Sequence, residues 1–167
     1  MTPSPRDVVC SPPGPSLGRF WSFYRGHENP FGHIHHNLDG ANCQVQSAGA
    51  GGKSYLWVAD DPADWSDAGY TNYTNVGEIP RASGYVSKVH GGSAVHWGVK
   101  TAAGSATTYF CDNSGTTIPG SGTNLSVVRT GAAAQGTTEC GLTFFNSGVL
   151  PSQAYTSVGF RLSYKTS

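Results

Sequence analysis

The stretch SVGFRLSY, residues 157–164, gives the most direct indication of how this chain folds. Its apolar side chains stand at every second position: Val158, Phe160, Leu162 and Tyr164. Because successive side chains of a β-strand point to opposite faces, this spacing predicts a strand with one face buried. The fold is therefore expected to contain a sheet whose core this strand helps to cover.

Short segments rich in β-branched and aromatic residues recur along the rest of the chain, separated by long loops of Gly, Ser, Thr and Asn. Such segments between turn-forming residues are typical of short strands. The predicted strands are 54–58, 84–89, 94–99, 107–111, 125–129 and 142–145. With 23 glycines among 167 residues, the composition favours a loop-rich protein over a helical bundle.

A helix is predicted ahead of these strands, in ENPFGHIHHNLDG, residues 28–40. Asn29 suits the N-cap, Pro30 suits the first helical position and Gly40 suits the position after the end. The apolar residues of one helical face would be Phe31, Ile34 and Leu38. A second short helix is predicted near DPADW, residues 61–65. Short strands, one or two short helices and long loops together predict an α+β fold.

The length and charge of the chain narrow the classes of protein to consider. Residues 1–16 are rich in Pro and Ser and are predicted to be a flexible leader or linker, while residues 17–167 suit one domain with one core. Lys plus Arg and Asp plus Glu each number 10, so nothing favours nucleic acid as a partner. No apolar run approaches the roughly 20 residues that span a bilayer, so no membrane insertion is expected.

Two groups of side chains are candidate metal ligands. His33 and His36 lie at helical spacing, but no acidic or Cys ligand is placed by the sequence to complete a shell. The carboxylates of ADDPADWSDAGY have oxygen ligands that suit Ca²⁺, although their spacing is not that of an EF-hand: Asp60, Asp61, Asp64 and Asp67. Helix-surface histidines and N-capping aspartates are the favoured interpretation, so no cofactor is expected.

Nothing in the sequence has the form of a catalytic motif. The cysteines allow three pairings, and none lies in a CxxC motif, so free thiols are favoured: Cys10, Cys43, Cys111 and Cys140. No GxSxG elbow and no phosphate-binding Gly-rich loop is present. The chemistry therefore indicates a binding module and not an enzyme.

Three stretches in order along the chain carry a family resemblance: YRGHENPFGHIHHNLDG (24–40), VVRTGAAAQG (127–136) and SVGFRL (157–162). Together they resemble the formylglycine-generating-enzyme branch of the C-type lectin fold, over residues 20–164. The matching residues are Gly32, Ile34, Asp39, Gly40, Val128, Arg129, Gly131, Gly159, Phe160 and Arg161. The resemblance implies a C-type lectin fold. The enzymes of this branch use a pair of cysteines between the last two motifs, whereas this interval holds Cys140 alone, which argues against oxidase activity.

A second group within the same fold, the variable proteins of diversity-generating retroelements, is similar in its C-terminal frame. That frame resembles GLTFFNSG (141–148) followed by VGFR (158–161), with interchangeable residues scattered between the fixed ones. The resemblance implies a phage or viral tail receptor-binding protein located in the virion tail. Its partners would be a host cell-surface protein or glycan, bound noncovalently, and other virion tail proteins. The alternatives are a structural virion decoration protein and a diverged formylglycine-generating-type oxidase.

The predicted contact surface lies in this C-terminal part. A surface that accepts many side chains needs a rigid backbone from other residues, here Gly131, Gly136, Gly141 and the strand from Val158 to Tyr164. The residues expected to point outward and bind a ligand are Ala133, Gln135, Thr137, Thr138, Glu139, Thr143, Phe145, Ser147 and Tyr155. For Phe145 and Tyr155, an ordinary core or loop position is the open alternative.

Overall fold

The computed structural model describes residues 23–24, 27–28, 35–91, 98–108, 110, 112–131, 144–153, 155 and 158–159. Its strands are β1 (Phe23–Tyr24), β2 (His27–Glu28), β3 (His35–Gln46), β4 (Ser54–Val58), β5 (Thr74–Glu78), β6 (Gly84–Tyr85), β7 (Lys88–Val89), β8 (Val99–Thr101), β9 (Asn113–Gly115), β10 (Thr123–Thr130), β11 (Phe145–Val149) and β12 (Val158–Gly159). Two 3₁₀ turns, η1 (Ala48–Ala50) and η2 (Pro62–Asp64), complete the described elements.

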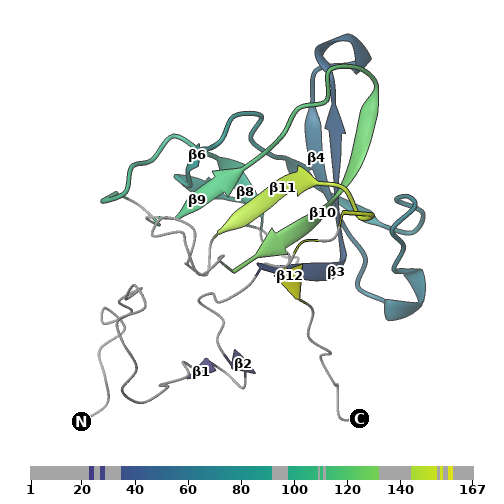
Figure 1. Ribbon diagram of the computed structural model, residues 1–167, viewed down its shortest axis with the longest axis horizontal. Helices are drawn as coiled ribbons and strands as arrows, with labels where there is room; N and C mark the ends of the chain where they lie inside the picture. Colours follow the sequence, from purple (N-terminus) through teal and green to yellow (C-terminus); the bar gives the residue numbers. More distant parts are fainter. Residues whose placement is uncertain are drawn as a thin grey trace.

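One large sheet organises the described part of the chain. Its strands follow the order β5-β4-β3-β10-β11-β9-β6, and β12 pairs in parallel with the start of β3. Figure 1 shows β9 and β11 running obliquely to β4, so the sheet is curled. The long strand β3 touches β4, β10 and β12, and it therefore joins the two halves of the sheet.

The expected α+β fold is wrong, because the described residues form strands and no α-helix. The helix predicted over 28–40 fails in its second half, where residues 35–40 belong to β3; residues 29–34 lie outside the described part. Its local signals were real but weak, and a helix this short is marginal without tertiary support. The helix predicted near DPADW is reduced to η2, which begins at a genuine cap: the Asp61 side chain accepts a hydrogen bond from the Ala63 N–H.

Gly40 marks an irregularity in β3 and does not end a helix. Val127 pairs with Asn42 but its neighbour Val128 pairs with Leu38, so the intervening residues of β3 bulge out of the ladder with β10. At the bulge Gly40 has φ = +73°, a conformation that strongly favours glycine. The bulge shifts the pairing of β3 along β10 and leaves the His35–Leu38 end facing the end of β10.

The core lies on one face of this curled sheet. Its buried members come from β3, β4, β8, β10 and β11 and from the residues that follow β5 and β6: Cys43, Val45, Leu56, Ile79, Val86, Val99, Val128 and Phe145. Leu56 at the centre of β4 and Val128 in β10 are each at most 2 % exposed. Burial of such branched side chains is the main favourable term for a sheet that has no helix packed on it in the described residues.

The strand predictions vary in accuracy. The segment 54–58 is confirmed as β4, and 125–129 is confirmed within β10. The segment 84–89 is divided into β6 and β7, because Val86 turns into the core between them. The prediction of a strand over 107–111 is wrong at Thr107, Thr108 and Phe110, because hydroxyl bonds around Ser105 close a turn there.

The other predicted strands fall partly outside the described residues. Of the segment 94–99 only the last two residues are described, and Val99 begins β8. Of the segment 142–145 the first two residues lie outside, and Phe145 opens β11. Of the opening stretch 157–164 only Val158 and Gly159 are described, as β12. The predicted leader 1–16 also lies outside, and no described helix is long and apolar enough to cross a membrane.

Candidate functional site

The predicted contact residues fall into three groups. One group lies in 132–143, outside the described part of the chain: Ala133, Gln135, Thr137, Thr138, Glu139 and Thr143. The backbone on both sides of that segment is described, ending at Gly131 and resuming at Phe144. The structure therefore shows how the two ends of the segment 132–143 are held, and the roles of the residues within it stay a prediction.

Phe145 and Ser147 form the second group, and the expectation that they point outward is wrong. Phe145 is 2 % exposed and belongs to the core, and Ser147 is 1 % exposed. The Ser147 hydroxyl donates to the Gly115 carbonyl over 3.4 Å and to Thr116 Oγ1 over 3.1 Å. Residues two apart in a strand share a face, so the apolar side chain at 145 takes Ser147 inward with it.

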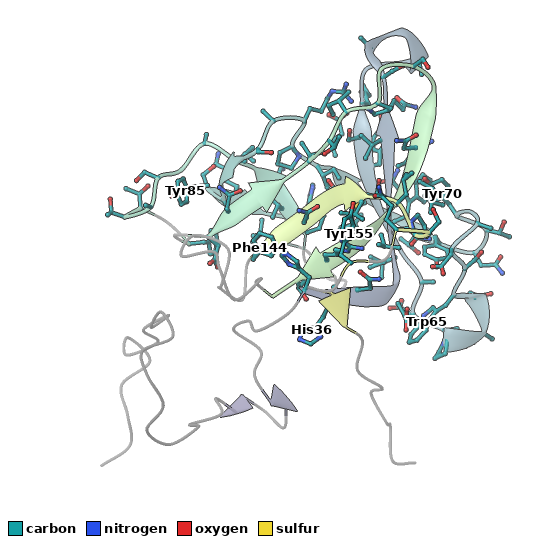
Figure 2. The ribbon with its side chains drawn as sticks, in the orientation of Figure 1. His36, Trp65, Tyr70, Tyr85, Phe144 and Tyr155 are labelled. Carbon is teal, nitrogen blue, oxygen red and sulfur yellow. The ribbon has the colours of Figure 1, made fainter. Side chains whose placement is uncertain are left out.

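Tyr155 is the third case, and it lies on the surface. Its side chain is 50 % exposed, one of the few large apolar groups in the described residues that reach solvent to this extent. In the view of Figure 2, Tyr155 projects onto the strands of the large sheet, and Trp65 lies to one side, next to η2. Of the predicted contact residues that the structure describes, Tyr155 alone is available to a ligand.

His35, at the start of β3, contacts both ends of the segment 132–143. Its Nδ1 lies 3.1 Å from the Gly131 carbonyl oxygen, at hydrogen-bonding distance. Its ring stacks on Phe144, with 5.5 Å between ring centroids and 26° between planes. One side chain thus connects the residue before the segment with the residue after it, and the backbone of β12 pairs with His35 as well. Gly131 has φ = +73°, which fits a sharp turn out of β10.

Arg129 fixes the neighbouring part of the surface. Its side chain is 3 % exposed, its Nε donates to Asn37 Oδ1 over 2.8 Å, and its Nη2 donates to the Gln153 carbonyl over 3.1 Å. The guanidinium carbon lies 5.3 Å from the centre of the Tyr155 ring, within the range of a cation–π contact. Burial lowers the pKa of Arg129, and the nearby Tyr155 opposes that shift.

The loop that carries Tyr155 is closed on itself. The Gln153 N–H donates to the Leu150 carbonyl, and the Leu150 N–H donates to Gln153 Oε1, both over 3.0 Å. In addition, Arg129 Nη2 donates a hydrogen bond to the Gln153 carbonyl. The backbone ahead of Tyr155 is therefore fixed by hydrogen bonds that do not involve the Tyr155 side chain itself.

Sequence reasoning missed the residues that fix Gly131, Phe144 and Gln153 in place. His35 was assigned to a helix surface, and Asn37 was given no role, because their partners lie more than ninety positions along the chain: the contacts His35–Gly131 and Arg129–Asn37 span 96 and 92 residues. Arg129 and Gly131 were matched to the C-terminal frame of the resemblance, and this was the only signal for them. Spacing within a short window carries no information on such partners.

The described residues do not support a metal centre or a reactive thiol at this surface. No three His, Cys, Asp or Glu side chains among them come together in a way that could hold a metal ion. Asp61 caps η2, and Asp64 accepts a hydrogen bond from Asn72 Nδ2 over 2.6 Å. Cys43 is a free thiol, as expected, and its burial raises its pKa, so thiolate is not formed there near neutral pH.

Comparison with known proteins adds no relative to this picture. No protein-family model, no curated protein and no solved structure matches the chain.

Proposed function

We propose that this protein is a phage or viral receptor-binding protein of the variable-protein class, which binds a ligand on the host surface noncovalently. The contact residues would be those of the segment 132–143 together with Tyr155. Phe145 and Ser147 are excluded from this surface because they are buried. The protein would act in the virion tail, alongside other tail proteins, and would carry out no chemical step.

The observation that carries the proposal is the way in which the ends of 132–143 are held. His35 contacts Gly131 on one side and Phe144 on the other, so the two ends are positioned by a residue of β3. A segment anchored from outside can exchange its own side chains without loss of the anchor. Antibody loops use the same division between a fixed scaffold and interchangeable contact residues.

Tyr155 adds an exposed aromatic group beside Arg129. Its backbone follows the closed turn 150–153, and its ring lies over Arg129. An aromatic side chain held in one place offers a large contact area at a small entropic cost on binding. A single site of this size binds weakly, and several copies on one virion would raise the effective affinity.

The first test is genomic. We expect a near-copy of the DNA that encodes residues 129–162 close to the gene, differing from it at adenines and adjacent to a reverse transcriptase gene. Codons for Phe145 and Ser147 should be conserved between the two copies, because their side chains are buried. A gene without such a copy nearby would contradict assignment to the variable-protein class.

The second test is adsorption. Purified protein, fluorescently labelled, is mixed with a panel of bacterial isolates that includes the phage host, and cell-bound fluorescence is measured. Joint exchange of Gln135, Thr138 and Tyr155 for alanine should remove binding while the melting temperature stays close to that of the parent. Exchange of Trp65, which is exposed on a different loop, serves as the matched control and should leave adsorption unchanged. Failure of the parent protein to bind any host cell, with a location on capsids instead of tail tips, would favour a structural virion component.

A further inference from the structure

The face of the large sheet that points away from the core carries a row of aromatic and polar side chains, here called the outer row. Tyr55 and Trp57 stand two residues apart in β4, on the opposite side of that strand from the buried Leu56. Strands β4, β3 and β10 lie side by side (Figure 1), so that Gln44 is paired with Tyr55 and Leu125 is paired with Gln44. Side chains directly opposite in paired strands share a face and lie close enough to touch. Tyr55, Gln44 and Leu125 therefore form the outer row, with Trp57 beside it.

The outer row is partly open to solvent. Tyr55, Gln44, Leu125 and the neighbouring Trp57 are each partly exposed. The next residue of β10 on this face, Val127, is only 5 % exposed, so the open part of the face ends there. A ring and an amide at a partly open position can contact a ligand without unfolding of the sheet beneath them.

Charged and aromatic groups border the outer row at its two sides. Lys53 Nζ donates to Glu78 Oε1 over 2.8 Å, and Glu78 is paired with Tyr55 across β4 and β5. Glu78 and, after it, Tyr55 raise the pKa of Lys53, which places the Tyr55 hydroxyl beside the ammonium group. On the other side, the Tyr70 ring packs against Trp57 with 5.4 Å between ring centroids. The face thus combines flat rings with hydrogen-bonding groups.

The indole N–H of Trp57 is a buried hydrogen-bond donor without an acceptor among the described residues. Buried donors in proteins are nearly always paired, so an unpaired one is costly and requires an explanation. The atom is closed to solvent, and an acceptor from outside therefore reaches it only when a neighbouring side chain moves. The Tyr70 ring rests on Trp57, and its hydroxyl lies 3.4 Å from the Cys43 carbonyl oxygen, at the weak end of the hydrogen-bond range. Rotation of Tyr70 would open this N–H to a ligand.

We propose that the outer row binds a carbohydrate, with a sugar ring stacked on Tyr55 and its hydroxyl groups hydrogen-bonded by Gln44 and the Trp57 N–H. A pyranose ring has an apolar face of C–H groups and a rim of hydroxyls, so it matches a flat aromatic ring beside an amide that both donates and accepts. A stable protein partner would need a far larger surface than one row of side chains. The site uses none of the residues proposed to contact the host ligand, and the inference therefore goes beyond the proposed function.

The first test is a titration of the full chain, followed by NMR at the indole N–H of Trp57. Uniformly ¹⁵N-labelled protein is titrated separately with cellobiose, lactose and chitobiose, and the Trp57 signal is assigned as the one missing from Trp57→Phe. We expect a saturable shift of this signal with at least one disaccharide. Sorbitol is the matched control, because it has the hydroxyl groups but no ring to stack. No saturable shift with any of the disaccharides, or an equal shift with sorbitol, would overturn the proposal.

Variants separate stacking from hydrogen bonding. Tyr55→Ser removes the ring and should weaken binding of the disaccharide about tenfold, whereas Tyr55→Phe keeps the ring and should recover most of that loss. Gln44→Leu removes the amide at a similar size and should weaken binding about fivefold, the usual effect of one hydrogen bond. Trp65→Phe, next to η2, is the control and should bind as the parent does. If Tyr55→Ser and Gln44→Leu stay folded and bind the disaccharide as tightly as the parent, the proposal is wrong.

One further measurement needs no substitution and separates a sugar from a protein as the ligand. Nuclear Overhauser contacts between the sugar C–H groups and the Tyr55 ring are expected in the parent protein, and their absence in a saturated complex would contradict the stacking. Sugar binding at Tyr55 in a protein that adsorbs to no host cell would leave this inference intact and contradict the receptor-binding role. Adsorption that Tyr55→Ser abolishes, in a protein that binds none of the disaccharides, would assign the outer row to a protein partner and overturn the carbohydrate proposal.

Discussion

The loop 59–73 and the segment 132–143 are both linked to side chains of β3, and the contacts described for the two differ. The loop 59–73 is fixed largely by its own side chains: Asp61 caps η2, Asn72 binds Asp64, and the Tyr73 hydroxyl accepts a hydrogen bond from the Ser66 N–H over 2.9 Å. The segment 132–143 is fixed at its ends by His35, a residue that belongs to another strand. The first loop therefore depends in part on its own side chains, whereas the contacts described at Gly131 and Phe144 come from a residue of β3.

Loop 59–73 is also attached to the sheet through several specific contacts. The buried amide of Asn42 donates to the carbonyls of Ser66 and Gly69 over 2.7 and 3.2 Å. The Tyr70 ring packs against Trp57 at 5.4 Å between centroids, and burial raises the pKa of Tyr70 to about 12, so its hydroxyl stays neutral. A loop with so many specific contacts is poorly suited to exchange of its side chains. Exchange of side chains is the role proposed for the segment 132–143, whose flanking residues Gly131 and Phe144 both contact His35.

The largest expected effect comes from a comparison of Phe145 and Tyr155. Both were predicted to be contact residues, but Phe145 is buried and Tyr155 is exposed. Phe145→Ala removes a fully buried ring from the core and should lower the free energy of unfolding by about 3–5 kcal/mol. Tyr155→Ala, at a half-exposed site, should lower it by under about 1 kcal/mol. Urea denaturation followed by tryptophan fluorescence measures both. Equal losses for the two variants would mean that they do not occupy different environments.

Phe145 and Tyr155 also show how much of the structure can be predicted from the sequence. Enrichment in β-branched and aromatic residues correctly identified β4 and the middle of β10, where Leu56 and Val128 enter the core. Period-two alternation places Phe145 and Ser147 of FFNSG on one face, so the core position left open for Phe145 also takes Ser147 inward. The resemblance favoured a surface position for both residues, and a core position was kept as an alternative for Phe145 alone.

The helix predicted over 28–40 was a different kind of error, which no local rule would have corrected. Asn37 pairs with Arg129 and His36 pairs with Thr130, contacts that join distant parts of the chain. Backbone pairing with β10 and β12 outweighs the helix signals of Asn29 and Gly40. The same distance in sequence hid the roles of His35 and Arg129, so the residues that define the candidate site were the hardest to find.

A second, smaller effect is expected where loop 59–73 meets the bulge of β3. A methyl group on Gly40 would collide with the Trp65 ring and approach the Ala59 carbonyl to 2.9 Å, and the residue has φ = +73°. Gly40→Ala should therefore cost about 1–3 kcal/mol of unfolding free energy. Gly49→Ala is the matched control, since a methyl group there meets nothing within 4 Å, and it should change stability by under about 0.5 kcal/mol. If the two variants lose similar amounts of unfolding free energy in the same denaturation assay, the packing of Trp65 on Gly40 does not attach loop 59–73 to β3 in a specific way.

The third effect concerns His35 and separates its two contacts. His35→Ala loses both the bond to the Gly131 carbonyl and the stacking on Phe144, and it should cost about 1–2 kcal/mol. His35→Phe keeps an aromatic ring and should recover part of that loss. Limited proteolysis with mass-spectrometric mapping provides the specific measurement, because loosening the ends of 132–143 should speed cleavage inside that segment. Cleavage at the parent rate in His35→Ala would contradict the role of His35 in holding both ends.

The smallest effect on stability is expected from the largest number of changes. Joint exchange of six residues of the segment 132–143 should shift the unfolding free energy by no more than about 1 kcal/mol, because the proposed function requires these side chains to be interchangeable surface groups, and surface changes are each close to neutral. The exchanged residues are Ala133, Gln135, Thr137, Thr138, Glu139 and Thr143.

The matched experiment exchanges Asp61, Asp64 and Asn72 for alanine, which removes the cap and the amide–carboxylate bond of loop 59–73. We expect fewer changes to cost more there, because a helix cap and a charged hydrogen bond are each worth about 1 kcal/mol. If the six exchanges destabilise the protein more than these three do, the segment 132–143 contributes its own side chains to the fold, and it is no more tolerant of exchange than loop 59–73.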